Sequence, residues 1–411
     1  MKKKTESKTL LQIIGERRSV RRYDGTDVPA DAIRSAARVL DLAPGRGGER
    51  CWRFIILRDD KERGRLIDAA LGSLKGKINS WLAAKGIPAM IAACADPGSG
   101  AGAGPKPAGR LRDKRFYLSD TSIAMELLVL AAREGGLGTC WIGAFEEGPV
   151  RRALGVGKDM RVVAISPLGH PYKKPPALTD LAAQYDRYTE QTLHKRRLPL
   201  RDIVYLNKYG DRLELPFRDD VFRSAKSGKA GTGEVIQTLA GSMKFADSFS
   251  ERRPKREQLA WIFEAARLAP SANNSQPWRF ILVDDRKQRE ALESATCDED
   301  GMPAPLSQAP VVIAAAAETP LVPVSKHEQP YFMIDIPIAI SHILLMAAEL
   351  GIAANVLFDF SERRVRRVLK IPDRSRVVAL ISLGHPAEKG EKFPLEYFAA
   401  KPAKKHTFEI R

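Results

Sequence analysis

The chain has 411 residues, with 67 Lys and Arg against 50 Asp and Glu, which gives a net charge of +17. Its 4 cysteines lie far apart with no CxxC pair, so the sequence predicts neither a disulfide framework nor a metal site. No uninterrupted apolar run reaches the roughly 18 to 20 residues that cross a bilayer, and the basic N-terminus lacks the apolar segment of a signal peptide. We therefore expect a cytoplasmic protein with no membrane partner.

The positive charge raises nucleic-acid binding as an alternative. The basic residues are interspersed with acidic ones, and the sequence has no RRM, KH or zinc-finger signature. A solvated basic surface that attracts anionic cofactors is the favoured interpretation. Nucleic-acid binding, which predicts salt-sensitive retention on DNA, is the weaker alternative.

Helical and strand patterns alternate along the chain. In the first half, the predicted elements are helices at Leu10–Glu16 and Asp31–Leu42, strands at Arg53–Leu57 and Met90–Cys94, a long helix at Ser122–Glu134 and a strand that runs into LGHP at residues 168–171. In the second half, strands at Arg279–Val283 and Val311–Ala317 precede a long helix at Pro337–Glu349 and a strand that runs into LGHP at residues 383–386. Helices interleaved with short apolar strands predict a sheet flanked by helices.

The same elements occur twice, so the chain is a tandem duplication. CWRF at residues 51–54 matches QPWRF at 276–280, and RVVAISPLGHP at 161–171 matches RVVALISLGHP at 376–386. A period near half the chain length indicates duplicated domains, because solenoid repeats are far shorter. We expect copy one at residues 1–210, a linker at 211–233 containing SAKSGKAGTG, and copy two at 234–411.

Each copy has lost a polar segment that the other keeps. When Trp52 is superposed on Trp278, the RRS of residues 17–19 falls on MKF of residues 243–245. In the other direction, the loop SANNSQ of residues 271–276 falls on GRGGER of residues 45–50. The basic segment survives only in copy one and the amide-rich segment only in copy two. This pattern predicts one composite ligand site made by both copies.

Three motifs, RRSVRRY (17–23), GTCWIGAFEEGPVRRALG (138–155) and APSANNSQPWRF (269–280), resemble the FMN-dependent nitroreductase superfamily. Proteins of this family are homodimers in which one subunit supplies the arginine segment and its partner the PSxxN loop of each FMN site. The resemblance implies an α+β fold of three α/β/α layers, with the two copies forming an intramolecular pseudo-dimer. It also implies one FMN per chain, and a chain that is complete as a monomer.

By this resemblance, each segment has a role in binding FMN. Guanidinium groups suit a phosphate dianion, and neutral amides suit a flavin ring that carries donors and acceptors. The residues that match the family's positions are Arg17, Arg18 and Ser19 with Lys195 and Arg197 for the phosphate, Arg21 for the pyrimidine edge, Gly143 and Ala144 for the backbone near N5, and Pro270, Ser271, Asn273 and Asn274 for the ring and ribityl chain.

The activity implied by the resemblance is that of an oxidoreductase, in which hydride passes from NAD(P)H through flavin N5 to an electron-poor small molecule such as a nitroaromatic or a quinone. No protein nucleophile is required. Arg21 would stabilise the negative charge of the reduced flavin ring. Two alternatives stay open. One is a flavin-fragmenting, dehalogenating or dehydrogenating relative on the same fold. The other is a non-catalytic flavin- or ligand-binding protein.

Overall fold

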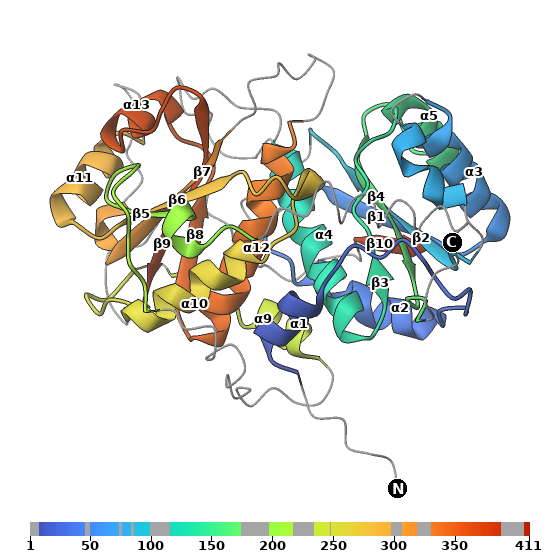
Figure 1. Cartoon of the computed structure of the whole chain (residues 1–411), viewed down its shortest axis with the longest axis horizontal. Helices are drawn as coiled ribbons and strands as arrows, with labels where there is room; N and C mark the ends of the chain where they lie inside the picture. Colours follow the sequence, from blue (N-terminus) through green and yellow to red (C-terminus); the bar gives the residue numbers. More distant parts are fainter. Residues whose placement is uncertain are drawn as a thin grey trace, which may run out of the picture.

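Two lobes lie side by side in the computed structural model of the chain, each built around a five-stranded sheet (Figure 1). The structure describes residues 8–45, 50–73, 76–83, 86–98, 116–173, 197–216, 234–246, 248–296, 306–318, 330–387 and 407–411. Each sheet has helices on both faces, so the expected three-layer α/β/α arrangement is confirmed in both copies.

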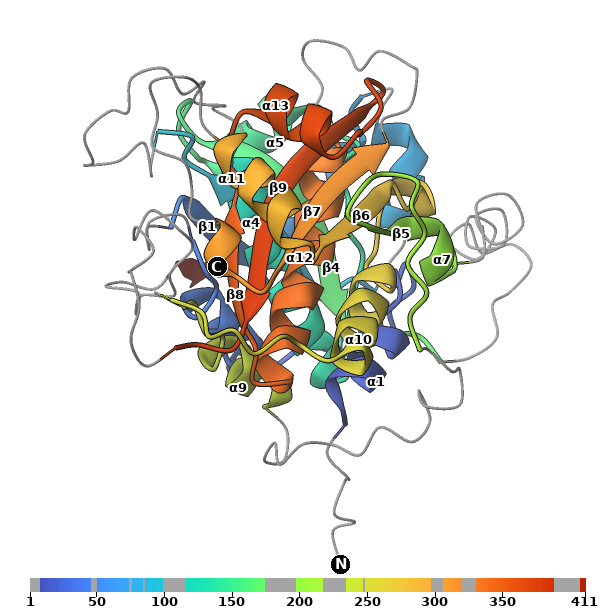
Figure 2. The same cartoon turned by 90° about the vertical axis from the view of Figure 1, so that its left-hand side faces the viewer.

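The two sheets have matching strand orders. The first runs β10-β1-β2-β4-β3 and the second runs β5-β6-β7-β9-β8. The strands of the first sheet are β1 (Trp52–Leu57), β2 (Ala89–Ala95), β3 (Gly138–Thr139), β4 (Arg161–Gly169) and β10 (Phe408–Ile410). Those of the second are β5 (Val204–Leu206), β6 (Trp278–Val283), β7 (Val311–Glu318), β8 (Ala353–Leu357) and β9 (Ser375–Gly384). Figure 2, which faces the second lobe, shows β5 and β8 at opposite edges.

Helices and short 3-10 turns connect these strands. In copy one they are α1 (Leu10–Glu16), α2 (Ala30–Ala37), η1 (Arg38–Asp41), α3 (Asp60–Leu71), η3 (Gly76–Ala83), α4 (Phe116–Glu134), α5 (Glu147–Leu154) and α7 (Leu200–Ile203). In copy two they are α9 (Val235–Gly241), α10 (Arg256–Arg267), η4 (Ala272–Asn274), α11 (Arg286–Ser294), η5 (Leu306–Gln308), α12 (Phe332–Glu349) and α13 (Glu362–Val368).

Side-chain alternation along the strands explains why each sheet is covered on both faces. In β1, Phe54 and Ile56 belong to the large central core, while Ile55 and Leu57 belong to a separate outer core under α3 and α5. Successive side chains of a strand point to opposite faces, so a strand that is apolar at every position needs cover on both sides. The same alternation occurs in β6 of copy two.

Strands near the ends of the two copies are exchanged between the lobes. β5, which lies near the end of copy one in the sequence, pairs in parallel with β6 of copy two. β10, at residues 408–410, pairs in parallel with β1 of copy one. The division at residues 1–210, 211–233 and 234–411 stays a prediction, and the exchange means that each sheet is completed by a strand from the other part of the chain.

The helices α4 and α12 lie between the lobes and join them (Figure 1). Residues 117–132 of α4 and 333–347 of α12 are all buried, so both helices are covered on every side. A helix that is apolar all round is stable only inside a protein or a membrane. One core therefore runs continuously from copy one to copy two.

α12 is also apolar enough, by length and composition, to cross a membrane. Its mean hydropathy is 1.6, and 83% of it is buried inside the structure. It packs against α4, α9 and α10. These contacts are those of the core helix of a folded domain.

We expect that removing residues 407–411 destabilises the lobe formed by copy one. The deletion takes away backbone hydrogen bonds from Arg411 N–H to Ile56 O and from Phe54 N–H to Thr407 O, together with the half-buried Phe408. The loss should be about 3 kcal/mol of unfolding free energy, measured by urea denaturation. Glu409→Ala, which removes only a partly exposed ion pair with Arg411, should change it by less than about 0.5 kcal/mol. Equal stability of the deletion and the full chain would show that β10 contributes nothing.

Candidate functional site

The arginine segment of copy one leaves α1 in a fixed direction. α1 begins with a capping box, in which Thr9 accepts from the Gln12 N–H and the Gln12 side chain accepts from the Thr9 N–H. After the helix, the Val20 N–H donates to Thr139 O at 2.8 Å, which ties the segment to β3. Arg17 lies between these two anchored points.

Arg17 provides a cation with an unused donor. Its side chain is half-buried, and its Nε atom is inaccessible and has no hydrogen-bond partner among the described residues. Burial lowers the pKa of Arg17, while the nearby Glu126 and Cys140 act in the opposite direction. A guanidinium in this state can bind an oxyanion without first giving up another side-chain bond at Nε. Arg18 and Ser19, the other two predicted phosphate ligands of this segment, are exposed.

Arg197 joins the arm of copy one to copy two. Its guanidinium donates to Ala269 O at 2.6 Å, Leu268 O at 3.0 Å and Arg267 O at 3.4 Å, the carbonyls at the C-terminal end of α10. A cation suits these carbonyls because they carry the negative end of the helix dipole. Burial, and then repulsion from Arg17, lowers the pKa of Arg197 to about 10. Arg17 and Arg197 are therefore neighbours, as expected of two phosphate ligands, whereas Lys195 lies outside the described residues.

The amide-rich loop of copy two begins where Arg197 binds. Asn273, Asn274 and Gln276 all have positive φ angles, a conformation that asparagine adopts more readily than most residues. The Ser271 hydroxyl accepts from the Gln276 N–H at 2.9 Å, and Gln276 Oε1 accepts from the Leu198 N–H at 2.8 Å. The loop is thus built against the arm of copy one. Asn273 is exposed, whereas Pro270, Ser271 and Asn274 are half-buried.

Asp335 in α12 binds the backbone of the same loop. Its carboxylate accepts a hydrogen bond from the Ala272 N–H at 3.0 Å. Burial raises the pKa of Asp335 to about 7, and this hydrogen bond opposes the rise. Copy one carries Asp120 at the same place in its long helix, where it is also buried. The aspartate survives in both copies, although copy one has lost the amide loop.

The WIGAF segment of copy one meets an aromatic residue of copy two. A Cβ added at Gly143 would lie 3.0 Å from Cε1 of Tyr331, so the ring of Tyr331 rests on the Gly143 backbone. Ala144 O accepts a hydrogen bond from Asn79 at 3.0 Å. Glycine at 143 therefore permits a close approach from the other copy. Tyr331 is 42% exposed.

Arg21 lies against the neighbouring part of copy one. Its guanidinium carbon is 5.9 Å from the centre of the Trp81 ring, a distance at which a cation is attracted to the ring face. Trp81 belongs to η3, the same turn that supplies Asn79 to Ala144. The predicted role of Arg21 beside the pyrimidine edge of a flavin stays a prediction.

The segment of copy two that corresponds to RRS packs against the core through its apolar side chains. Met243 and Phe245, which replace the RRS of copy one, pack against the central core. The side chain of Asn355 holds this segment through hydrogen bonds with the backbone N–H and C=O of Ala246, at 2.9 and 2.8 Å. Lys244 is exposed. Copy two thus presents two hydrophobic side chains and one lysine where copy one presents two guanidinium groups and a serine.

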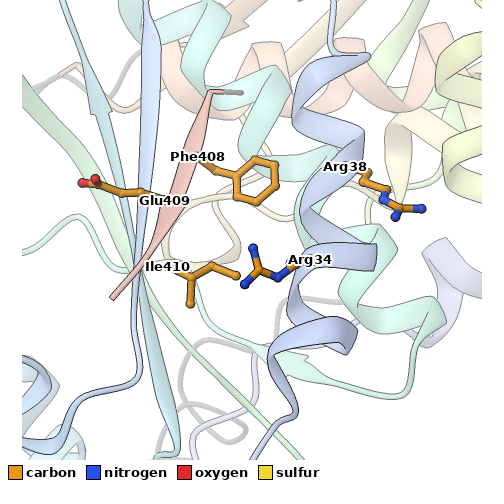
Figure 3. Close-up of a pocket in the computed structure, with 5 residues that line it drawn as sticks. All are labelled: Arg34, Arg38, Phe408, Glu409 and Ile410. Carbon is orange, nitrogen blue, oxygen red and sulfur yellow. The ribbon is translucent and has the colours of Figure 1, made fainter. Parts of the chain in front are cut away.

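A hollow of about 240 Å³ lies elsewhere, between α2 and β10 (Figure 3). Phe408 and Ile410 point toward α2, and Glu409 points away from it (Figure 3). Arg34 and Arg38 line the opposite wall, and both are exposed. The sequence-predicted site residues do not line this hollow, so it is separate from the composite site.

Several residues that shape the composite site were missed by the sequence interpretation. They are Glu126, Tyr331 and Asp335, together with His342 of α12, whose Nε2 lies 3.0 Å from Oε1 of Glu126. The aspartates of the two long helices occupy matching positions, a signal that the repeat comparison could have found. A glutamate and a histidine within apolar helices were a second available signal, because charged residues are rarely buried without a partner. The contact of Tyr331 with Gly143 has no signal in the sequence.

We expect Asp335→Asn to change the pH dependence of stability. The folded chain holds the Asp335 proton up to about pH 7, whereas an unfolded chain releases it near its ordinary pKa of about 3.9. The folded state therefore binds more protons between these values, and its stability falls as the pH rises through them. Between pH 4 and pH 8, the unfolding free energy of the variant should rise by about 3 kcal/mol relative to that of wild type, measured by denaturant titration. Asp31→Asn, at a fully exposed carboxyl, is the control. If the difference in unfolding free energy between the variant and wild type stays constant from pH 4 to pH 8, the raised pKa of Asp335 is contradicted.

Comparison with known proteins places the chain in a family. The sequence model of the Nitroreductase family matches residues 14–170 and 248–385. A protein of Archaeoglobus fulgidus assigned as an NADH dehydrogenase/NAD(P)H nitroreductase is 34% identical over 145 residues, covering 34% of this chain and 79% of that protein.

The iodotyrosine deiodinase of Thermotoga neapolitana is 24% identical over 182 residues, covering 39% of this chain and 94% of that protein. A solved structure, the FMN-dependent nitroreductase of Clostridium difficile, is 26% identical with a TM-score of 0.31, covering 37% of this chain and 88% of that one. With the family match repeated in both halves, the chain belongs to the nitroreductase family as a tandem-duplicated member.

Proposed function

We propose that the chain is an FMN-dependent oxidoreductase that uses NAD(P)H to reduce an electron-poor small molecule at one composite site between its copies. The observation that carries this proposal is the pair Arg17 and Arg197. Two neighbouring guanidinium groups of copy one lie at the start of the amide loop of copy two. Like charges placed together below the surface favour a bound anion.

The residues present fit FMN. Arg17 has a buried Nε atom with no partner among the described residues, which suits one oxygen of a phosphate. Arg197 already binds the end of α10 through two of its nitrogen atoms, so we assign it a smaller share of phosphate binding than Arg17. When bound, FMN takes hydride from NAD(P)H and passes it to the acceptor.

The remaining residues would shape the ring side of the site. The loop from Pro270 to Asn274 offers backbone and amide groups held in place by Asp335 and Gln276. Gly143 leaves room for a planar group to approach the backbone, and Tyr331 now lies over that position. We propose that Tyr331 moves to admit the acceptor and excludes water when it returns. The chain would then complete its site as a monomer.

A reductive dehalogenase is the second candidate. The relative named iodotyrosine deiodinase matches this chain over 94% of its own length. Purified FMN-loaded chain should oxidise NADH or NADPH in the presence of a nitroaromatic or a quinone. Turnover with a halogenated aromatic acceptor alone would favour the dehalogenase. No turnover with any acceptor would favour a non-catalytic flavin-binding protein.

We expect one FMN per chain. At the second site, Met243 and Phe245, packed against the core, stand where copy one has Arg17 and Ser19, and Lys244 between them is exposed, so this segment offers a phosphate dianion less positive charge than its counterpart in copy one. The flavin absorbance of the saturated protein, divided by its protein concentration, measures the ratio. A ratio close to two would contradict the assignment of the halves.

The same assignment predicts which substitutions weaken FMN binding. Arg17→Ala should raise the dissociation constant by about 10- to 100-fold, since a hydrogen bond to a charged group contributes about 1.5 to 3 kcal/mol. Asn274→Ala should raise it by about fivefold, because a neutral hydrogen bond contributes about 1 kcal/mol. The matched control is Lys244→Ala, which removes a cation from the degenerate site and should leave the constant unchanged. Equal losses in all three variants would show that both sites bind FMN.

A further inference from the structure

A glutamate and a histidine meet at the centre of the contact between the copies. Glu126 of α4 and His342 of α12 have no solvent exposure, and Oε1 of Glu126 lies 3.0 Å from Nε2 of His342. Nδ1 of His342 lies 2.9 Å from Ala265 O of α10. Both members of this polar contact between the copies are fully buried, and the proposed reaction does not use them.

The partners of the imidazole determine how many protons the pair holds. A carbonyl oxygen only accepts, so Nδ1 must carry a proton that it donates to Ala265 O. The contact between Nε2 and Oε1 then requires one further proton, because two lone pairs at 3.0 Å repel each other. The pair is therefore either an imidazolium with a carboxylate or a neutral imidazole with a carboxylic acid. It has no net charge in both cases.

The pair connects all three walls of the composite site. Oε2 of Glu126 accepts from Nε1 of Trp141 at 3.0 Å, and Trp141 begins the WIGAF segment. The Glu126 charge also acts on Arg17. Through His342, the pair reaches Ala265 in the last turns of α10, a few residues before the amide loop. One buried contact thus joins the arginine segment, the WIGAF segment and the loop of the other copy.

Glu126 and His342 are not equivalent residues of the two copies. With Asp120 aligned on Asp335, Glu126 matches Ser341 and His342 matches Leu127. Each copy therefore supplies one member, and neither copy has both. A buried polar pair of this kind holds two surfaces in one register, because any other register leaves a charged group unpaired.

We propose that Glu126 and His342 are positioning residues, which fix the amide loop of copy two relative to Arg17 and Trp141 of copy one. This inference rests on the proposed function for its consequence in FMN binding. The mechanical link between the copies is a property of the chain itself, so it can be measured without a cofactor.

Two substitutions of His342 separate its two contacts. His342→Gln keeps a donor at the Nε2 position for Glu126 and loses the bond to Ala265, whereas His342→Asn keeps a donor at the Nδ1 position and loses the bond to Glu126. Glu126→Gln can keep both of its contacts while it removes the charge. The matched control is Ser341→Ala, because Ser341 is equally buried in α12 but its hydroxyl bonds only to Ile338 O of its own helix.

The first measurement is hydrogen exchange of residues 265–274 in the chain without flavin. His342→Gln should speed exchange there, while Ser341→Ala and Glu126→Gln should match wild type. The second is the FMN dissociation constant, which should rise by about tenfold in both His342 variants, a loss typical of removing a supporting hydrogen bond behind a ligand-binding group. Glu126→Gln should stay within about threefold of wild type.

The outcomes distinguish the two proposals. Wild-type exchange in His342→Gln, or equal acceleration in Ser341→Ala, would overturn the positioning role. An accelerated exchange in a chain that binds no FMN would support the positioning role and overturn the proposed function. Thermal unfolding of each variant identifies any that fail to fold, and Glu126→Gln then serves as the variant that retains the packing.

Discussion

The burial of α4 against α12 is the contact on which the rest of the structure depends. Both helices are buried on all sides and most of their residues are apolar, so neither copy could expose its helix to water without a large cost in free energy. Joining the two faces produces one continuous core and brings the arginine segment of copy one to the amide loop of copy two. The composite site is thus a consequence of how the two cores are joined.

Strand exchange strengthens this arrangement from the outside. β5 carries the arm that contains Arg197 across to the second sheet, where Leu198 and Arg197 bind the loop and the end of α10. β10 returns to the first sheet in the same way. Each lobe therefore depends on a strand that the sequence assigns to the other copy. Arg197, on this arm, is held by backbone carbonyls of copy two, although it is encoded with copy one.

Much of the architecture could be predicted from the sequence, because the repeats preserve the same alternation of apolar strands and helices. The α+β fold and the duplication follow from the repeated WRF and LGHP segments, and the family match in both halves confirms them. Strand exchange could not be predicted, since β5 and β10 are only three residues long and carry no distinctive pattern. The arginine segment was visible as a contrast between RRS and MKF. Glu126 and His342 stand out as polar residues within apolar helices, but their contact could not be predicted because it crosses the interface between the copies.

Duplication allows the two copies to differ in sequence, whereas the two subunits of a homodimer are identical. In a homodimer every substitution appears in both sites, whereas here copy two has MKF at residues 243–245 while copy one keeps RRS at residues 17–19. The same freedom allows a pair such as Glu126 and His342, in which each copy supplies a different member. The segment of copy two can then pack against the core through apolar side chains while copy one keeps the half-buried Arg17.

An experimental structure of the chain with FMN tests the central claim most directly. The account predicts a single FMN between the copies, with its phosphate at Arg17 and its ring against the loop from Pro270 to Asn274. FMN bound instead between the segment from Met243 to Phe245 and the loop of copy one, or bound within one lobe alone, would contradict it.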